Sequence, residues 1–457
     1  MSASDYRYQQ RPVVDPDWRR FPAWRHVTEA EWRDVKWQRR NCVKSPADLE
    51  EVTGGRLGET FLEDLVRDQR DHATMSLLLP PHVINSFAPD DLPGADAWQV
   101  DPRRRYMLPI ASDRLTGPWR SHPMAERDSL HEAEMWVVEG LTHRYPTKVL
   151  AELTSTCPQY CGHCTRMDLV GQSTPQVDKR RMIVRPGQRW QEMLSHIAEH
   201  PQVRDVVVSG GDVANVPWPR LESFVADLVR IPHVRDIRLA SKAVVDMPQH
   251  WLTDKARQTM SRLAQAARER DTMLAVHTHV NHGNAMSPLA AEAVAELLSL
   301  GVRDVRNQGV LMAGVNDTTE DVLDLCYGLL DNLQVMPYYF YLCDMIPNAE
   351  HWRTTLSRAI EIQEAIMGHL PGFATPRLIC DVPYAGKKWV HQVSLYDEER
   401  GISYWKTSFG PTGSDQDETE AFPYYDPVHL LPPSGQAWWR AAAAGSAHGG
   451  DRHRHHS

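Results

Sequence analysis

The sequence predicts an α/β fold, a partial (β/α)6 barrel that follows a helical N-terminal extension and precedes a C-terminal lid segment. From about Val149, short apolar runs typical of strands alternate with amphipathic segments of helical length. Six such units in succession are typical of a parallel sheet with right-handed crossovers. The block from Val149 to about Pro383 is too short for eight units, so we expect the barrel to be partial.

The elements follow in order along the chain. Residues 1–140 form the predicted helical extension, with patterns WRDVKWQRRN, PADLEEV and ETFLEDLVRDQRDH. In the barrel block, residues 141–383, the predicted strands are VLAELT, DVVVSG, DIRLAS, MLAVHTH, VRNQGVL and PYYFYLC. The predicted helices between them are WQEMLSHIAEH, LESFVADLVRI, DKARQTMSRLAQAARER, SPLAAEAVAELLSLG and TTEDVLDLCYGLLDNL. Residues 384–415 form a lysine-containing loop and C-terminal segment, and residues 416–457, which end in GSAHGGDRHRHHS, are expected to be disordered.

Composition excludes several classes of protein. The 457 residues are 42% hydrophobic, which rules out wholesale disorder. The 50 Lys and Arg against 60 Asp and Glu give a formal net charge of -10, which argues against a nucleic-acid partner. No apolar run is long enough to cross a bilayer, and the N-terminus carries no apolar signal segment. We therefore expect a cytoplasmic protein with no membrane partner.

Three of the seven cysteines lie within eight positions. Cys157, Cys161 and Cys164 follow the first predicted strand of the barrel with the spacing C-x3-C-x2-C. In a reducing compartment such a group indicates a metal site or catalysis and not disulfides. Three thiolates can hold three irons of a [4Fe-4S] cluster and leave the fourth iron without a protein ligand, whereas structural zinc sites take four ligands.

This cysteine triad at a strand end, opening a partial barrel, resembles the radical S-adenosylmethionine superfamily. The resemblance implies that S-adenosylmethionine binds the open iron and that its reductive cleavage releases a deoxyadenosyl radical. The next strand ends in SGGD, Ser209, Gly210, Gly211 and Asp212, which resembles the element that meets the methionine part of S-adenosylmethionine. Glycine permits close approach of the backbone there. An ordinary strand-to-helix turn is the alternative reading of SGGD.

From about Trp32 to Tyr404 the chain also resembles the lysine 2,3-aminomutases, which use pyridoxal phosphate. The segments that carry this resemblance are WRDVKWQRRN, GLTHRYPTKVL, CGHCTR, QVRDVVVSGGD, THVNHGN, NQGVLMAGVND, PYYFYLCDM and CDVPYAGKK. Their number and order make a chance match implausible. The cofactors that this resemblance implies are a [4Fe-4S] cluster, S-adenosylmethionine and pyridoxal phosphate.

The resemblance assigns residues to pyridoxal phosphate. Arg144 resembles the arginine that grips the cofactor phosphate, a task suited to a bidentate guanidinium, with Tyr145 beside it. Lys242 stands where relatives have a phosphate-binding arginine. A lysine must hold the cofactor aldehyde as a Schiff base, and counting from Asp381 places Lys388 in that role. Lys387 is the close competitor.

The substrate residues are also assigned by resemblance. Arg166 matches the arginine that pairs with the substrate carboxylate, although it could instead compensate charge beside the cluster. Asp344 and Asp381 match the two acids that hold the distal cation of lysine. Two acids converging on one site require a cation between them, because unpaired they would raise each other's pKa. The alternative roles of these two aspartates are a helix cap and a loop turn. A cationic amino acid, lysine or arginine, is therefore the expected substrate.

Besides Lys242, the chain departs from the family pattern in the loop before the lysine and in its C-terminal cysteines. The glycine run before the Schiff-base lysine is replaced by Tyr384, Ala385, Gly386 and Lys387. No cysteine follows Cys380, so no C-terminal zinc site is predicted.

The leading hypothesis is a 2,3-aminomutase that moves the α-amino group to the β-carbon. The alternative is a desaturase of arginine or lysine that consumes S-adenosylmethionine, and a third reading is a non-catalytic iron–sulfur protein. An external one-electron reductant and a homodimer or higher homo-oligomer are the expected partners.

Overall fold

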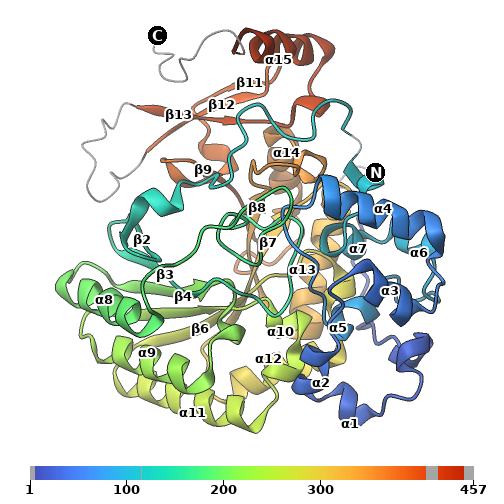
Figure 1. Cartoon of the computed structure of the whole chain (residues 1–457). Helices are drawn as coiled ribbons and strands as arrows, with labels where there is room; N and C mark the ends of the chain where they lie inside the picture. The colour runs from blue at the N-terminus through green and yellow to red at the C-terminus, as the bar shows by residue number, and fades with distance from the viewer. Residues whose placement is uncertain (1–5, 115, 408–419, 447–457) are drawn as a thin grey trace.

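The computed structural model describes residues 6–114, 116–407 and 420–446. Short helices build the N-terminal extension, which lies at the right of Figure 1. They are α1 (Glu29–Trp32), α2 (Val35–Arg40), α3 (Pro46–Thr53), α4 (Gly58–Asp71), α5 (Pro81–Asn85), α6 (Ala95–Val100) and α7 (Pro102–Met107). Ser45 begins α3 with a capping box, and Pro46 occupies its first turn. The tryptophans of this region pack together, with the rings of Trp18 and Trp32 stacked at 4.9 Å.

A sheet of ten strands runs in chain order from β1 to β10. Its strands are β1 (Trp136–Val138), β2 (Leu141–Tyr145), β3 (Lys148–Thr154), β4 (Asp205–Gly210), β5 (Asp236–Ala240), β6 (Met273–Thr278), β7 (Val305–Leu311), β8 (Met336–Leu342), β9 (Arg377–Val382) and β10 (Gly386–Trp389). From β3 to β9 neighbouring strands are parallel, whereas β1, β2 and β10 join the edges antiparallel. The predicted mixed α/β class, with a sheet dominated by parallel strands, is confirmed.

The parallel part of the sheet has one strand more than predicted. β9 follows α14 (Leu356–Ile366) and pairs with β8, which makes seven parallel strands where the sequence predicts six. The run RLICDV is short, lies between Pro376 and Pro383 and contains two charged residues, so its strand character depends on the neighbour that pairs with it. Within the described residues no ladder joins β1 to β10, so the sheet is open.

Helices cover one face of this sheet. They are α8 (Pro186–Glu199), α9 (Trp218–Arg230), α10 (Ala243–Asp246), α11 (Asp254–Glu269), α12 (Pro288–Ser299), α13 (Thr319–Leu333) and α14. In β3 the residues Val149, Ala151 and Leu153 belong to the core under these helices. Because side chains alternate along a strand, Glu152 and Thr154 point to the opposite face. On β9, Asp381 lies on the face opposite this core, because its neighbours Cys380 and Val382 belong to the core.

Single turns of 3-10 helix connect many of these elements. They are η2 (Trp18–Arg20), η3 (Pro22–Trp24), η4 (Ala111–Arg114), η5 (Glu132–Met135), η6 (Val213–Asn215), η7 (Pro248–His250), η8 (Gly283–Ala285), η9 (Glu350–Trp352), η10 (Val390–Gln392) and η11 (Val428–Leu430).

The C-terminal region forms a small unit at the top of Figure 1. It contains β11 (Leu395–Asp397), β12 (Ile402–Lys406), β13 (Ala421–Tyr425) and α15 (Pro433–Ser446). The predicted disorder of residues 416–457 is therefore wrong for residues 420–446. Phe422 and Tyr424 alternate into the main core, and Trp439 packs in a separate cluster with Trp119, so the segment buries apolar area despite its Ala-rich end. The His-rich end of this predicted tail lies outside the described residues.

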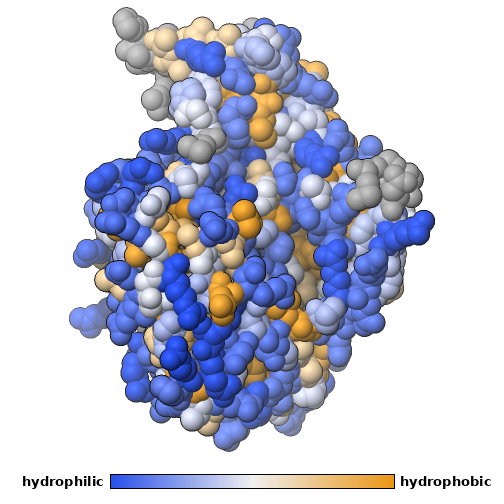
Figure 2. All heavy atoms as spheres, turned by 90° about the vertical axis from the view of Figure 1, so that its right-hand side faces the viewer, coloured by the Kyte–Doolittle hydropathy of each residue, from blue (hydrophilic) through white to orange (hydrophobic). Residues whose placement is uncertain are grey.

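The surface shown in Figure 2 is mostly hydrophilic, with small hydrophobic areas between polar side chains. None of the helices in the described ranges combines the length and the apolar character that a membrane crossing requires.

Candidate active site

The three predicted cluster cysteines lie on one loop, residues 155–171, which we call the cysteine loop. It leaves the carboxyl end of β3, and the N-terminal extension holds its backbone in place. The amide of Tyr160 donates to the carbonyl of Leu78 at 3.0 Å, and the amide of Gly162 donates to the carbonyl of Tyr106 at 2.9 Å. A Cβ atom at Gly162 would lie 2.6 Å from a ring carbon of Trp352, so only glycine fits between Cys161 and His163. The extension therefore positions the three cysteines that are predicted to be ligands.

All three thiols are free and half-buried. Burial raises the pKa of Cys157 and Cys161, and it raises the pKa of Cys164 to about 12. Across the described ranges, no three His, Cys, Asp or Glu side chains gather closely enough to hold a single metal ion. A four-iron cluster differs from such a site because each thiolate binds its own iron. Three free thiols on one loop fit that requirement, whereas Cys42, Cys326, Cys343 and Cys380 are buried singly.

The SGGD element packs against the start of the cysteine loop. Gly210 has φ +125°, and a Cβ atom there would lie 2.2 Å from the carbonyl oxygen of Thr154. A Cβ atom at Gly211 would lie 2.3 Å from the carbonyl oxygen of Thr156. The sequence predicts these glycines for close approach to a cofactor, and the structure shows a close approach to the chain itself. Both glycines are needed for β4 to meet the end of β3.

Asp212 ties two strand ends together. Its carboxylate accepts hydrogen bonds from the Ala214 amide at 2.8 Å, the Ser241 hydroxyl at 2.7 Å and the Lys242 amide at 2.8 Å. Burial raises the pKa of Asp212 to about 6, although these hydrogen bonds lower it. Asp212 thus links the carboxyl end of β4 to the segment after β5. Ser209, at the end of β4, lies 3.5 Å from a guanidinium nitrogen of Arg166.

Arg166 lies between two glutamates that the sequence analysis does not single out. Its Nε is 2.9 Å from Glu132 Oε2 and 3.0 Å from Glu152 Oε1. Its Nη1 donates to the carbonyl of Gly210 at 3.3 Å, and within the described residues its Nη2 has no hydrogen-bond partner. Arg166 is therefore anchored through its Nε and Nη1 atoms, and its Nη2 atom stays available for another hydrogen bond. Glu152 could have been noticed as the one charged residue in the run VLAELT.

These charges are strongly interdependent. Burial raises the pKa of Glu152 to about 7, an effect that Arg166 opposes and Glu132 reinforces. Burial also raises the pKa of Glu132, but the Arg166 guanidinium outweighs burial, so the pKa of Glu132 is lowered. Arg166 consequently stays charged beside its two carboxylates.

Arg144 and Asp381 form a buried ion pair. Arg144 Nη1 lies 2.7 Å from Asp381 Oδ1, and Arg144 Nη2 donates to the carbonyl of Val382 at 2.6 Å. The sequence assigns Arg144 to a phosphate and Asp381 to a substrate cation, whereas the structure pairs them with each other. Arg144 Nε is buried and has no hydrogen-bond partner among the described residues, so one donor of this guanidinium is left unsatisfied.

Asp344 lies at the carboxyl end of β8 without an ion pair. It accepts a hydrogen bond from the Thr165 hydroxyl, and within the described part of the chain no Lys, Arg or His pairs with it. Burial and the nearby charge of Asp381 raise the pKa of Asp344 to about 7. Asp344 and Asp381 are thus close enough to influence each other, as the sequence predicts. Only Asp344 lacks a compensating cation.

The two candidate lysines point to opposite faces of β10. In the antiparallel ladder Lys387 pairs with Asp381 and Lys388 pairs with Cys380. Cys380 belongs to the core under the helices, so Lys388, which is 3% exposed, shares that face. Lys387 Nζ lies 5.3 Å from the ring centroid of Tyr341, and the Lys387 amide donates to the Tyr145 hydroxyl at 3.1 Å. The structure therefore brings Lys387, and not Lys388, together with Asp381, Arg144 and Tyr145.

Lys242 lies apart from this group. Its Nζ is 3.4 Å from Met107 Sδ, 3.8 Å from Asp246 and 5.1 Å from the ring centroid of Tyr106. Its charge opposes the burial that raises the pKa of Cys161. Because the carbonyl of the same Tyr106 accepts from the Gly162 amide of the cysteine loop, these contacts place Lys242 at that loop.

The loop before the lysines is fastened to the N-terminal extension. Tyr384 has φ +62° and His131 has φ +54°, a left-handed region that favours glycine. Their rings stack with centroids 4.4 Å apart. Tyr384 thus keeps the backbone shape of a glycine position and adds a contact that glycine lacks.

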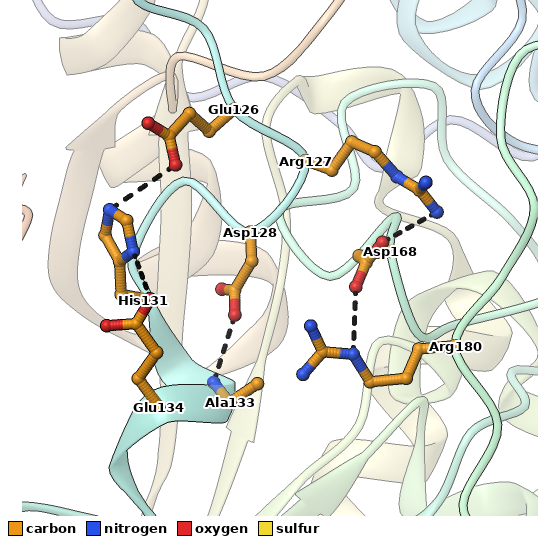
Figure 3. Close-up of a pocket in the computed structure, with 8 residues that line it drawn as sticks. All are labelled: Glu126, Arg127, Asp128, His131, Ala133, Glu134, Asp168 and Arg180. Carbon is orange, nitrogen blue, oxygen red and sulfur yellow. Dashed lines mark hydrogen bonds and ion pairs between the residues drawn. The ribbon is translucent and has the colours of Figure 1, made fainter. Parts of the chain in front are cut away.

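An open pocket of about 560 Å³ is shown in Figure 3. It is lined by Glu126, Arg127, Asp128, His131, Ala133, Glu134, Asp168 and Arg180. In Figure 3 the guanidinium groups of Arg127 and Arg180 both point to Asp168, at 2.8 and 3.3 Å. None of the predicted site residues lines this pocket.

Several known proteins resemble the chain, although no family model matches it. The L-lysine 2,3-aminomutase of Fusobacterium nucleatum is 34% identical over 363 residues, 79% of this chain and 77% of that protein. The L-lysine 2,3-aminomutase of Clostridium subterminale is 33% identical over 81% of this chain and 80% of that protein. A glutamate 2,3-aminomutase of Clostridioides difficile is 27% identical over 79% and 77%. Among solved structures, a radical SAM methyltransferase from Sphaerobacter thermophilus matches 52% of this chain and 68% of its own, with 18% identity and a TM-score of 0.33.

Proposed function

We propose a reaction from one premise, that the chain belongs to the lysine 2,3-aminomutase family. The protein is a radical S-adenosylmethionine aminomutase, an isomerase, that acts on a cationic amino acid. The observation that carries the choice of substrate charge is Asp344, a half-buried carboxylate without an ion pair in the described part of the chain. The acidic side chain of glutamate would add a further negative charge beside Asp344, whereas lysine or arginine would neutralise it.

The chain supplies three kinds of contact in this proposal. Cys157, Cys161 and Cys164 would hold the [4Fe-4S] cluster, which with S-adenosylmethionine supplies the hydrogen-abstracting radical when both are bound. Arg166 would take the substrate carboxylate through its open Nη2, since Glu132 and Glu152 already hold its Nε. Asp344 would take the distal cation. With both ends of the substrate held, one carbon faces the radical.

Pyridoxal phosphate belongs to the proposal as the group that supplies an aldehyde to carry the amino nitrogen when bound. Three features support its binding: the Nε of Arg144, which has no hydrogen-bond partner in the described part of the chain, the Tyr145 hydroxyl, and the side chain of Lys387, which lies on the same face as Asp381. We assign the cofactor lysine to Lys387, because Lys388 shares its face with Cys380 in the core. We do not assign Lys242 to pyridoxal phosphate, because it lies at the cysteine loop.

A partial barrel, an external one-electron reductant, a homo-oligomer and a cytoplasmic location complete the proposal. The barrel is supported by the strand order, in which each parallel strand from β3 to β9 lies beside the next in the chain. The reductant follows from the chemistry, because the cluster must gain one electron before S-adenosylmethionine is cleaved.

The deciding experiment is anaerobic incubation of the reconstituted full-length protein with S-adenosylmethionine, pyridoxal phosphate, a reductant and one amino acid. L-Lysine, L-arginine and L-glutamate are compared, and products are identified by mass spectrometry against β-amino acid standards. An isomer from lysine or arginine, with S-adenosylmethionine regenerated, is expected. A product two hydrogens lighter, with one 5′-deoxyadenosine formed per product, would contradict the aminomutase. An isomer from glutamate alone would contradict the role of Asp344.

A further inference from the structure

Lys179 is a buried lysine that the proposed reaction does not use. Its side-chain nitrogen donates to the carbonyl of Thr74 at 2.6 Å and to the carbonyl of Met167, and it lies 3.5 Å from Met75 Sδ. The residue is 7% exposed, and within the described residues no carboxylate forms an ion pair with it. An ammonium group held in the interior by dipoles alone is costly unless a negative charge lies close by.

The contacts of Lys179 bind it to the cysteine loop. Met167 lies on that loop three residues after Cys164, and Thr74 lies on the N-terminal extension that supports the loop. The backbone is held as well, because the Lys179 amide donates to Ser173 Oγ at 3.1 Å and the following amide, of Arg180, donates to the carbonyl of Asp168 at 2.7 Å. The ammonium group therefore has a defined place beside the predicted cluster.

Three cations lie at the cysteine loop. Lys179 Nζ donates to the carbonyl of Met167, Arg166 belongs to the loop itself, and Lys242 Nζ lies 5.1 Å from the ring centroid of Tyr106, whose carbonyl accepts from the Gly162 amide. Burial lowers the pKa of Lys179 to about 8, and the nearby Cys164 and Asp168 oppose this effect. Lys179 thus keeps most of its charge at neutral pH.

Lys179 differs from the other two cations because its charge is not cancelled. Arg166 contacts two glutamates, and Lys242 lies 3.8 Å from Asp246. The acid that influences Lys179, Asp168, is already neutralised by Arg127 and Arg180, whose guanidinium groups both point to it in Figure 3. Of these three cations, Lys179 is therefore the one that no carboxylate of the described residues neutralises in an ion pair.

We propose that Lys179 is a fixed cation beside the [4Fe-4S] cluster and that its positive charge raises the reduction potential of the cluster. The inference rests on the cluster that the proposed function places at the three cysteines. In the relevant step an external one-electron donor is oxidised and the cluster is reduced, so that the net charge of the cluster becomes one unit more negative. A nearby cation stabilises the reduced form more than the oxidised form, because the attraction grows with the negative charge.

The test is an anaerobic redox titration of the reconstituted full-length protein, followed by the electron paramagnetic resonance signal of the reduced cluster, with no amino acid present. Lys179→Gln keeps donors for both carbonyls without the charge, and Lys179→Arg keeps the charge. Lys255→Met, which changes an exposed lysine of α11, is the matched control. We expect a more negative midpoint potential for K179Q, a nearly unchanged one for K179R and no shift for K255M.

A K179Q protein with the wild-type potential and full iron content would overturn the inference, as would equal shifts for K179Q and K179R. If K179Q retains no cluster, Lys179→Met replaces it in the same comparison, and a wild-type potential there overturns the inference equally. If the wild-type protein itself binds no [4Fe-4S] cluster, the proposed function fails together with the inference. A wild-type cluster with no shift in the variants removes the inference alone.

Discussion

The cysteine loop and the hairpin of β9 and β10 both carry predicted cofactor ligands, but they depend on different levels of structure. In the cysteine loop three ligands lie within eight positions, so chain spacing alone keeps them close together. In the hairpin two neighbouring lysines point to opposite faces, so the pairing of β10 with β9 selects which of them reaches Asp381. A shift of one residue in a strand exchanges its two faces, whereas a loop has no such alternation. Motifs on loops can therefore be assigned by spacing more safely than motifs on strands.

The largest expected effect concerns the cysteine loop. Cys164→Ala should abolish cluster binding and all activity, because two thiolates do not hold the three-ligand cluster. Iron and sulfide analysis after anaerobic reconstitution measures the loss. Cys326→Ala, which changes a buried cysteine of α13, is the control and should keep full iron content. Normal iron content in C164A would break the assignment of this loop.

The next effect distinguishes the two lysines of the hairpin. Lys387→Ala should lower activity by roughly 100-fold or more, since it removes the group that holds the cofactor aldehyde and exchanges protons with it. Borohydride treatment followed by peptide mass analysis should find the cofactor fixed to Lys387 in the wild type and absent from K387A. Lys388→Ala is the matched control and should still be labelled. Label on Lys388 in the wild type would reverse the assignment.

Asp344 gives an intermediate effect that depends on pH. Asp344→Asn should raise the KM for the cationic amino acid by roughly 30-fold or more, because truncating one partner of a buried charge pair costs about 2 kcal/mol or more. Burial raises the pKa of Asp344 to about 7, so acidification through pH 7 protonates it and should weaken substrate binding in the wild type. KM measured between pH 6 and 8 should therefore rise toward low pH, and D344N should lose this dependence.

The raised pKa of Asp344 affects folding stability with the opposite sign to its effect on substrate binding. A carboxyl whose pKa is raised on folding binds its proton more tightly in the folded state, so without substrate its contribution to stability improves as the pH falls from 8 toward 5. Denaturant unfolding of the wild type and D344N across this range checks the sign. A larger pH dependence in D344N than in the wild type would contradict it.

The smallest effect concerns the loop before the lysines. Tyr384→Gly should change the free energy of unfolding by less than about 1 kcal/mol, because relief of left-handed strain offsets loss of the stack on His131. Tyr384→Ala should destabilise by about 1 kcal/mol, since it loses the stack and keeps the strain. Urea unfolding of both variants measures the difference. Equal stabilities of the two would show that the strain at φ +62° has no cost.

Parts of the site were predictable because they depend on local sequence. The cysteine triad and the approach of Asp344 to Asp381 follow from motifs at strand ends, which meet at one edge of a parallel sheet. The partners of Arg166 were not predictable in the same way, since Glu132 comes from the N-terminal extension and Glu152 from the strand before the loop. Contacts between elements distant in the chain depend on packing. The pairing of Arg144 with Asp381 is a further example, because those residues are 237 positions apart.

The sequence by itself determined the alternation of strands and helices, the family and the grouping of three cysteines within eight positions, because these depend on periodicity and on residues close together in the chain. Only the tertiary structure decided that Lys387 and not Lys388 faces the polar side, that Arg166 is held by two glutamates, and that Lys242 and Lys179 lie beside the cysteine loop. Residues 420–446 likewise fold only because Phe422, Tyr424 and Trp439 find apolar partners elsewhere. In each case the deciding quantity is a contact whose two halves are far apart in the sequence, and its free energy exists only once the chain is packed.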